Sequence, residues 1–181
     1  EHCNLDETAT ASEFAINSIP SGYSTANIQI GETLSVKDLL YALMLQSANE
    51  SAVILAEHVS GSQEAFADLM NKKAKEIGCE NSHFVNPNGI HNNDHYTTAH
   101  DLALISNYAM KNSTFRDIVK TTSFTLPATS AYPSATRTYI NTNNLLIYDN
   151  RNRPDNYYYE YATGIKTGYT TEAKNCLVSS A

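Results

Sequence analysis

Apolar residues recur at helical spacing along the first two thirds of the chain. Ser35 can cap a first helix, in which Asp38 lies in the first turn and an apolar run extends from Leu39 to Leu45. The same periodicity predicts four further helices, over residues 50–59, 63–77, 99–110 and 114–119. Between the third and fourth helices, residues 81–95 are rich in Asn, His, Pro and Gly, and this composition favours a loop.

After Lys120 the pattern changes to alternating Thr, Tyr and β-branched residues. This alternation predicts strands over residues 122–126, 136–140, 161–167 and 176–180. Because no repeat or linker divides the chain, we expect one domain over residues 1–181, with a helical lobe at 34–120 and a mainly sheet-forming part at 121–181. A run of helices followed by a run of strands is typical of an α+β fold, here a helical lobe packed beside an antiparallel sheet.

Charge and composition argue against several classes of protein. The sequence has 12 Lys and Arg against 19 Asp and Glu, a net charge of −7 without basic runs, so we expect no nucleic-acid partner. The longest apolar run, Leu39 to Leu45, is far shorter than the roughly 20 residues of a membrane-spanning helix. His91, Asp94 and His95 lie in one loop, but loops rich in Asn, Asp and His commonly just form turns. The cysteines also lack the spacing of a zinc site, so we expect neither a metal nor another cofactor.

Two short motifs carry side chains suited to catalysis. The first, Ser47-Ala48-Asn49, falls in a predicted turn between two apolar helices, where a hydroxyl that relays protons and an amide that donates and accepts can share one side. The second, Lys166-Thr167-Gly168, falls in a predicted strand, where the lysine can hold a carboxylate and the glycine admits a ligand close to the backbone. Each tripeptide alone also has a plainer interpretation, the first as a helix N-cap and the second as an exposed lysine beside a turn glycine.

The order of these two widely separated motifs is that of the penicillin-recognising serine enzymes. The chain resembles the low-molecular-weight penicillin-binding proteins of the D-alanyl-D-alanine carboxypeptidase type, the S11 serine peptidases. The resemblance covers most of the chain, and its longest stretches are SVKDLLYALMLQSANESAVILAEHVSGS, EAFADLMNKKAKEIG, HFVNPNGIHNNDHYTTAHDLALI and GIKTGYTTEAKNCLVSSA.

This resemblance implies a transpeptidase-like fold of the kind that β-lactamases share, with a substrate cleft between the helical lobe and the sheet. It implies a reaction on peptidoglycan stem peptides that end in D-Ala-D-Ala. In such enzymes an activated Ser attacks the penultimate D-Ala carbonyl, the terminal D-Ala leaves, and water hydrolyses the acyl-enzyme. β-Lactams would bind the intact enzyme, which would act outside the cytoplasm, in the bacterial cell envelope or secreted.

The resemblance also implies roles for the residues at the matching motif positions. Ser47 would pass a proton toward the leaving amine, Asn49 would orient the substrate amide and the catalytic lysine, and Lys166 would supply positive charge near Ser47. Three further positions would bind the substrate, namely Thr167, Gly168 and Tyr169. The threonine would hold the carboxylate, the glycine would leave space, and the backbone N–H of the tyrosine would be one of two oxyanion-hole donors, each worth about 2.7 to 4 kcal/mol.

One motif of the family is missing from this sequence. No Ser is followed three positions later by Lys, and Ser35 with Lys37 has the wrong helical spacing for a shared face. We therefore expect a partial domain that begins after the Ser-x-x-Lys motif and that forms no acyl-enzyme by itself. Its membrane association would depend on segments outside this chain, and a truncated sheet would expose an edge able to pair with a second copy.

Two other classes of protein compete with this interpretation. A non-catalytic peptidoglycan-binding or regulatory homologue would have lost the nucleophile and would use Ser47, Asn49 and Lys166 only for binding. A class A β-lactamase would need a deacylating Glu, and no convincing equivalent is recognisable between residues 81 and 163. The retention of every residue type in the two remaining motifs favours the carboxypeptidase.

Overall fold

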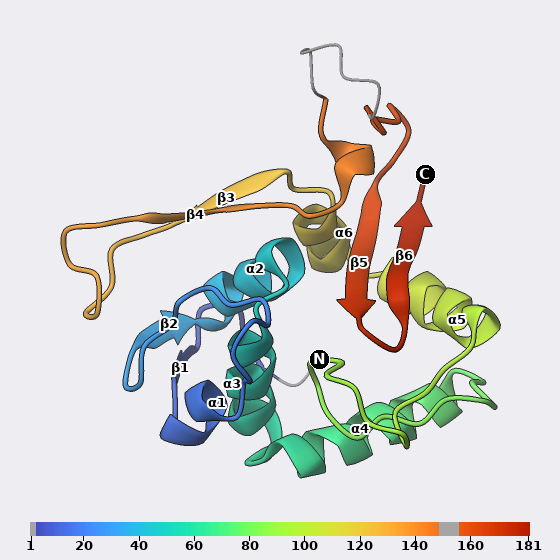
Figure 1. Cartoon of the computed structure of the whole chain (residues 1–181), viewed down its shortest axis with the longest axis horizontal. Coiled ribbons are helices and arrows are strands. Elements are labelled where there is room, and N and C mark those ends of the chain that lie inside the picture. Colours follow the sequence, from blue (N-terminus) through green and yellow to red (C-terminus); the bar gives the residue numbers. More distant parts are fainter. Residues whose placement is uncertain (1–2, 149–155) are drawn as a thin grey trace.

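A computed structural model describes residues 3–148 and 156–181, and mixes helices with antiparallel strands (Figure 1). The α-helices are α1 (Glu13–Asn17), α2 (Val36–Gln46), α3 (Asn49–Ser60), α4 (Gln63–Glu76), α5 (Ala99–Ala109) and α6 (Ser113–Val119). The strands are β1 (Thr8–Thr10), β2 (Thr33–Ser35), β3 (Ser123–Leu126), β4 (Arg137–Ile140), β5 (Gly164–Thr170) and β6 (Lys174–Ser180), and a 3-10 helix η1 spans Asn144–Leu146. The predicted α+β class is therefore confirmed.

Helices α2 to α6 match the predicted ranges closely because their ends carry local signals. The Ser35 hydroxyl accepts a hydrogen bond from the Asp38 N–H at 3.0 Å, which caps α2. Thr98 caps α5 in the same way, and α3 ends at Gly61, whose φ of +83° favours glycine. By contrast, α1, β1, β2 and η1 were not predicted, because a helix of five residues is less than two turns long and the other three elements have only three residues each.

The N-cap interpretation of the first motif is wrong. Ala48 occupies the N-cap position of α3 without a side-chain capping bond. Ser47 is instead the C-cap of α2, with a left-handed φ of +59°. The chain thus turns from α2 into α3 within two residues, and the Ser47 hydroxyl is not used to cap either helix.

The strands form three antiparallel pairs in the part of the chain that the structure describes, β1 with β2, β3 with β4 and β5 with β6. Residues that face each other in these pairs are Ala9 and Leu34, Phe124 and Tyr139, and Thr167 and Leu177. Figure 1 shows the β3–β4 pair extending over α2, while the β5–β6 pair stands beside α6 and α5. The period of two predicts that a segment is a strand, but it does not predict which strand becomes its partner.

The core centres on α2 and α3. Every residue of α3 from Asn49 to Ala56 is buried, so this helix is covered on all sides over its first two turns. On α2, Leu39 and Leu45 are fully buried, and the Tyr41 ring stacks on a phenylalanine of β3 with ring centroids 4.0 Å apart. Packing on both sides therefore fixes α2, and with it the turn that carries Ser47.

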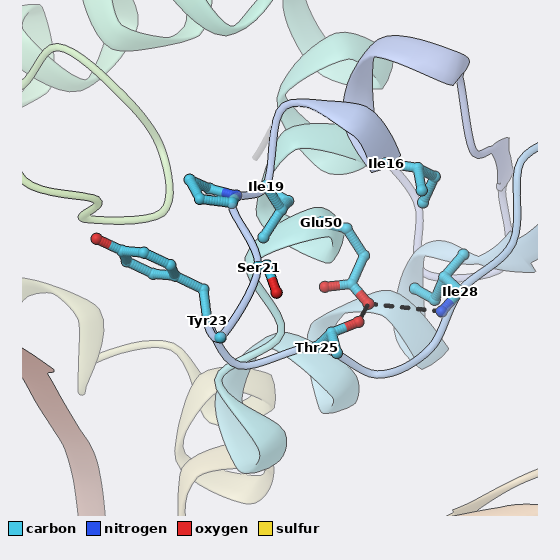
Figure 2. A pocket seen from close by; sticks show the side chains of 9 residues that line it. Ile16, Ile19, Ser21, Tyr23, Thr25, Ile28 and Glu50 are labelled. Atoms are coloured by element: carbon cyan, nitrogen blue, oxygen red, sulfur yellow. Dashed lines mark hydrogen bonds between the residues drawn. The ribbon is translucent and has the colours of Figure 1, made fainter.

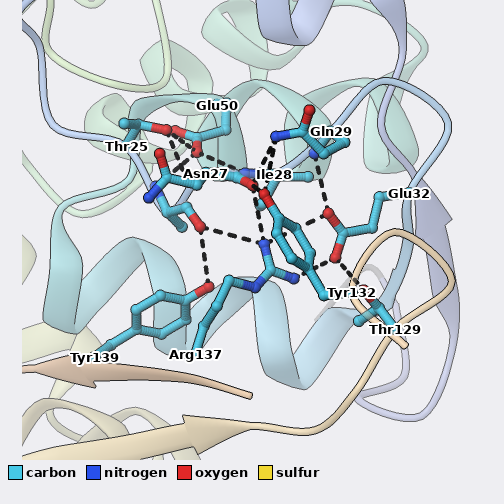
Figure 3. Close-up of polar contacts among 11 residues, drawn as sticks. Thr25, Asn27, Ile28, Gln29, Glu32, Glu50, Thr129, Tyr132, Arg137 and Tyr139 are labelled. Carbon is cyan, nitrogen blue, oxygen red and sulfur yellow. Dashed lines mark hydrogen bonds and ion pairs between the residues drawn. The ribbon is translucent and has the colours of Figure 1, made fainter. Parts of the chain in front are cut away.

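A buried ion pair joins the β3–β4 hairpin to the segment before β2 (Figure 3). Arg137 of β4 pairs with Glu32, whose side chain is completely buried, and also donates to the Asn27 carbonyl at 3.1 Å. The Thr129 hydroxyl donates to the same carboxylate at 2.6 Å, and the Tyr132 ring lies 4.3 Å from the guanidinium carbon. These contacts hold the hairpin against the helical part of the molecule.

Candidate active site

Ser47 and Lys166, which lie 119 residues apart in the sequence, are in direct contact in the structure. The Lys166 ammonium on β5 donates a hydrogen bond of 2.7 Å to the Ser47 hydroxyl and a second of 2.8 Å to the Thr167 carbonyl. The turn between α2 and α3 therefore faces the first half of β5. An acceptor hydroxyl held by a lysine is a pair through which a proton can pass.

Burial shifts the ionisation of this lysine toward neutral pH. Desolvation lowers the pKa of Lys166 from 10.5 to about 8, because burial removes water that stabilises the charged form. An amine with a pKa near 8 is present in both protonation states near neutral pH. It can therefore give up and regain a proton within one reaction cycle.

Asn49 is buried and fixes the loop before β2 to the start of α3. Its side-chain amide donates to the Ser24 carbonyl at 2.9 Å and to the Ser47 carbonyl at 3.5 Å, and its backbone N–H also donates to Ser24 at 3.1 Å. The amide thus holds the turn that presents Ser47. The hydrogen bonds of the Asn49 amide group join it to backbone and not to Lys166 in the described part of the chain.

The residues after Lys166 leave the outer side of β5 open. A Cβ built on Gly168 would meet nothing within 4 Å except the Cys176 Cβ at 4.0 Å, so local packing does not require a glycine there. Tyr169 is 64% exposed, and its ring contributes little to the core. A strand with this open side can admit an extended peptide along its backbone.

Thr142 lies beside the two motifs and was not predicted from the sequence. Its hydroxyl lies 2.6 Å from the Thr167 hydroxyl, and its backbone N–H donates to the Leu45 carbonyl at 3.3 Å. Buried Asn141 fixes its position by donating from its side chain to the Val119 carbonyl at 3.2 Å. No sequence signal marked Thr142, because a threonine among asparagines is typical of any polar loop.

The other candidate positions lie apart from a common centre. His91 is 4.0 Å from Glu172, and His95 accepts a 3.2 Å hydrogen bond from the Val85 N–H. Among the residues that the structure describes, no group of three or more His, Cys, Asp or Glu side chains is placed to hold a metal. Those residues also include no helix with the length and apolar character needed to cross a membrane.

Comparison with known proteins identifies the class to which this fold and site belong. A family model described as D-alanyl-D-alanine carboxypeptidase, peptidase S11, matches residues 1–181. The chain therefore belongs to the S11 family of D-alanyl-D-alanine carboxypeptidases, which confirms the resemblance seen in the sequence.

Individual relatives agree with this assignment. The chain is 36% identical over 160 residues to D-alanyl-D-alanine carboxypeptidase DacF of Bacillus subtilis, covering 88% of this chain and 38% of that protein. It is 38% identical over 190 residues to the D-alanyl-D-alanine carboxypeptidase of Streptomyces strain K15, covering 98% of this chain and 61% of that protein. The crystal structure of the Streptomyces K15 DD-transpeptidase matches with a TM-score of 0.84 at 35% identity, over 98% of this chain and 67% of that one. The chain thus spans between about two fifths and two thirds of the length of these relatives.

Proposed function

We propose that this chain supplies the Ser47–Lys166 side of the active site of a serine-type D-Ala-D-Ala carboxypeptidase. The observation that carries the proposal is the 2.7 Å hydrogen bond between the two side chains, which come from the two family motifs. The substrate would be a peptidoglycan stem peptide ending in D-Ala-D-Ala, and the enzyme would act in the cell envelope or outside the cell. β-Lactams would acylate the same nucleophile in the intact enzyme.

The proposed reaction begins with a nucleophilic serine that the Ser-x-x-Lys motif would supply, since no such motif occurs in this sequence. Its hydroxyl gives its proton to the lysine of that motif. Its oxygen then forms a bond to the carbonyl carbon of the penultimate D-Ala, and the bond from that carbon to the terminal amide nitrogen breaks. The Ser47 hydroxyl gives its proton to the leaving nitrogen, and the Lys166 ammonium returns a proton to Ser47. A lysine pKa of about 8 suits this exchange, because both forms of the amine are then accessible near neutral pH.

The substrate carboxylate would lie beside Lys166, Thr167 and Thr142. The lysine offers charge, and the two threonine hydroxyls, 2.6 Å apart, offer donors next to it. The open side of β5 at Gly168 leaves room for the terminal residue, and the backbone N–H of Tyr169 would stabilise the oxyanion. Asn49 would act by holding the Ser47 turn and by turning toward the substrate amide when a peptide binds.

A non-catalytic peptidoglycan-binding homologue is the second candidate, because no Ser in this sequence has a Lys three positions later. In that case Ser47, Asn49 and Lys166 would bind the peptide but would not take part in a reaction. Among the described residues, the outer edges of β5 and β6 have no strand partner, and a second copy would pair there in either case.

The first experiment is to measure binding of an acetylated tripeptide ending in D-Ala-D-Ala by calorimetry. We expect Lys166→Ala to weaken binding by about tenfold or more, as for loss of a hydrogen bond to a charged group, while exposed Lys174→Ala on β6 leaves it unchanged. Equal affinities for the two variants would refute the proposed site. A stoichiometric penicillin adduct on this chain would refute the expectation that it cannot be acylated alone.

A second experiment separates the two candidate functions. The coding region immediately before the codon for Glu1 is sequenced and searched for a Ser-x-x-Lys motif. A Ser and a Lys three positions apart in an apolar helix would support the carboxypeptidase, and their absence from the full gene would support the binding protein.

A further inference from the structure

A cavity of about 280 Å³ lies beside the first turn of α3, bordered by α1 and the loop that follows it (Figure 2). We call it the Glu50 cavity. It is lined by the aliphatic side chains of Ile16, Ile19 and Ile28, by Ser21 and Tyr23, and by Glu50. Its volume lies just below the roughly 300 to 1,000 Å³ of pockets that hold drug-sized ligands, so it suits a small group.

The two oxygens of the Glu50 carboxylate have different surroundings. Glu50 is 2% exposed, and its Oε1 atom accepts hydrogen bonds from the Thr25 hydroxyl at 2.5 Å and from the backbone N–H groups of Ala26 at 2.7 Å and Ile28 at 3.5 Å. Its Oε2 atom is buried and has no donor among the described residues. Figure 2 shows the carboxylate reaching from α3 toward the loop of Ser21 and Thr25. A buried carboxylate oxygen without a donor is unfavourable, so this oxygen has the capacity to accept one more hydrogen bond.

The wall of the cavity carries no cationic side chain that could pair with Glu50. No Lys, Arg or His is among the residues that line it. The guanidinium of Arg137, which donates to the Ala26 carbonyl at 3.3 Å, is already paired with Glu32. Glu50 Oε2 therefore lacks a hydrogen-bond donor, and a positively charged donor on an apolar stem would match both this oxygen and the isoleucine side chains of the wall.

We propose that the Glu50 cavity binds a primary ammonium group on a short aliphatic chain. The ammonium donates to Glu50 Oε2, and the methylene groups pack against the three isoleucines. Such a group could be the basic side chain of a peptide held at Ser47 and Lys166, or it could belong to a free amine. Asn49 connects the cavity to the Ser47–Lys166 pair. It directly precedes Glu50 and donates a hydrogen bond to the carbonyl of Ser24, which lies between Tyr23 and Thr25 of the cavity wall.

The test titrates the chain, labelled with ¹⁵N, with n-butylammonium and with n-butanol as its uncharged counterpart. We expect the ammonium ion to shift the amide resonances of Ala26 and Ile28 and to bind about tenfold more tightly than the alcohol, the factor for one hydrogen bond to a charged group. Glu50→Gln keeps the acceptor Oε1 and should remove this preference. Equal binding of the two probes, or no binding because water fills the cavity, would overturn the proposal.

A second pair of variants keeps the test informative if Glu50→Gln fails to fold. Ser21→Lys places a tethered ammonium at the cavity, and Ser21→Met places an uncharged chain of similar length there. We expect Ser21→Lys to have a higher melting temperature than Ser21→Met and to exclude n-butylammonium. A lysine variant no more stable than the methionine variant would contradict the proposal.

Peptides distinguish the two sources of the ammonium group, and this step alone rests on the proposed function. If a peptide side chain enters the cavity, acetyl-Lys-D-Ala-D-Ala binds more tightly than its norleucine counterpart, and Glu50→Gln abolishes the difference. Lys166→Ala would then weaken both peptides without removing the difference between them. Equal peptide affinities together with retained n-butylammonium binding would assign the cavity to a free amine. Loss of the Lys166 effect alone would refute the proposed function and leave the cavity proposal standing.

Discussion

The titration of Lys166 offers the sharpest quantitative test of the site. The drop in its pKa from 10.5 to about 8 corresponds to about 3 kcal/mol of free energy that disfavours the charged form in the folded protein. Below pH 8 the lysine is charged in both states, so the folded protein carries this penalty. Between pH 8 and pH 10.5 the unfolded chain binds more protons than the folded one, and stability therefore rises with pH.

The perturbation is Lys166→Met, which keeps the apolar stem and removes the titrating group. Urea unfolding of both proteins at pH 7 and pH 10 isolates the lysine, because other titrating groups cancel in the difference. Relative to the variant, the wild type should gain about 2 to 3 kcal/mol between these pH values, or about 1 M or more in the urea midpoint. A difference that does not change with pH would refute the assignment of burial as the cause. Affinity for a carboxylate-ended peptide should fall as pH rises through 8, and a peptide amide should not show this loss.

Four further predictions concern packing and the site. Arg137→Met should lower the free energy of unfolding in urea by about 3 to 5 kcal/mol because it leaves buried Glu32 unpaired, and a loss below about 1 kcal/mol would contradict this. Gly164→Ala should destabilise by about 1 to 3 kcal/mol in the same assay, since its Cβ would lie 2.8 Å from a valine methyl of α6. Gly168→Ala on the same strand should change stability by less than about 0.5 kcal/mol and yet weaken peptide binding. Thr142→Val should weaken peptide binding severalfold by calorimetry, and unchanged affinity would exclude Thr142 from the site.

The sequence predicted the helices well because their signals are local. Ser35, Thr98 and Gly61 act within one turn of their own helix, so neighbouring residues are enough to locate those ends. The strands at 161–167 and 176–180 were placed with less accuracy, since β5 runs from Gly164 to Thr170 and β6 begins at Lys174. Their ends are set by pairing with one another across the hairpin, which a single segment does not encode.

Only the residues of the two motifs could be predicted from the sequence as candidate site residues. Ser47 and Lys166 were predicted from their motifs, whereas their contact depends on how the β5–β6 hairpin packs beside α6, which in turn packs against α2. Thr142 was not predicted because its place beside the site comes from contact with Thr167 on β5, which is distant in the sequence. The Glu50 carboxylate gave no signal either, since a glutamate in the first turn of a helix is usually explained by the helix dipole alone.

The contact between Ser47 and Lys166 also has a consequence for the order of folding. Helices α2 and α3 and the β5–β6 hairpin each form from neighbouring residues, whereas their meeting closes a loop of 119 residues. Closing such a loop costs about 4 kcal/mol in chain entropy before any contact compensates for it. The hairpin should therefore dock late and detach early, and amide hydrogens of β5 should exchange with solvent sooner than those of α3. A site assembled in this way is completed only when the rest of the domain has already formed.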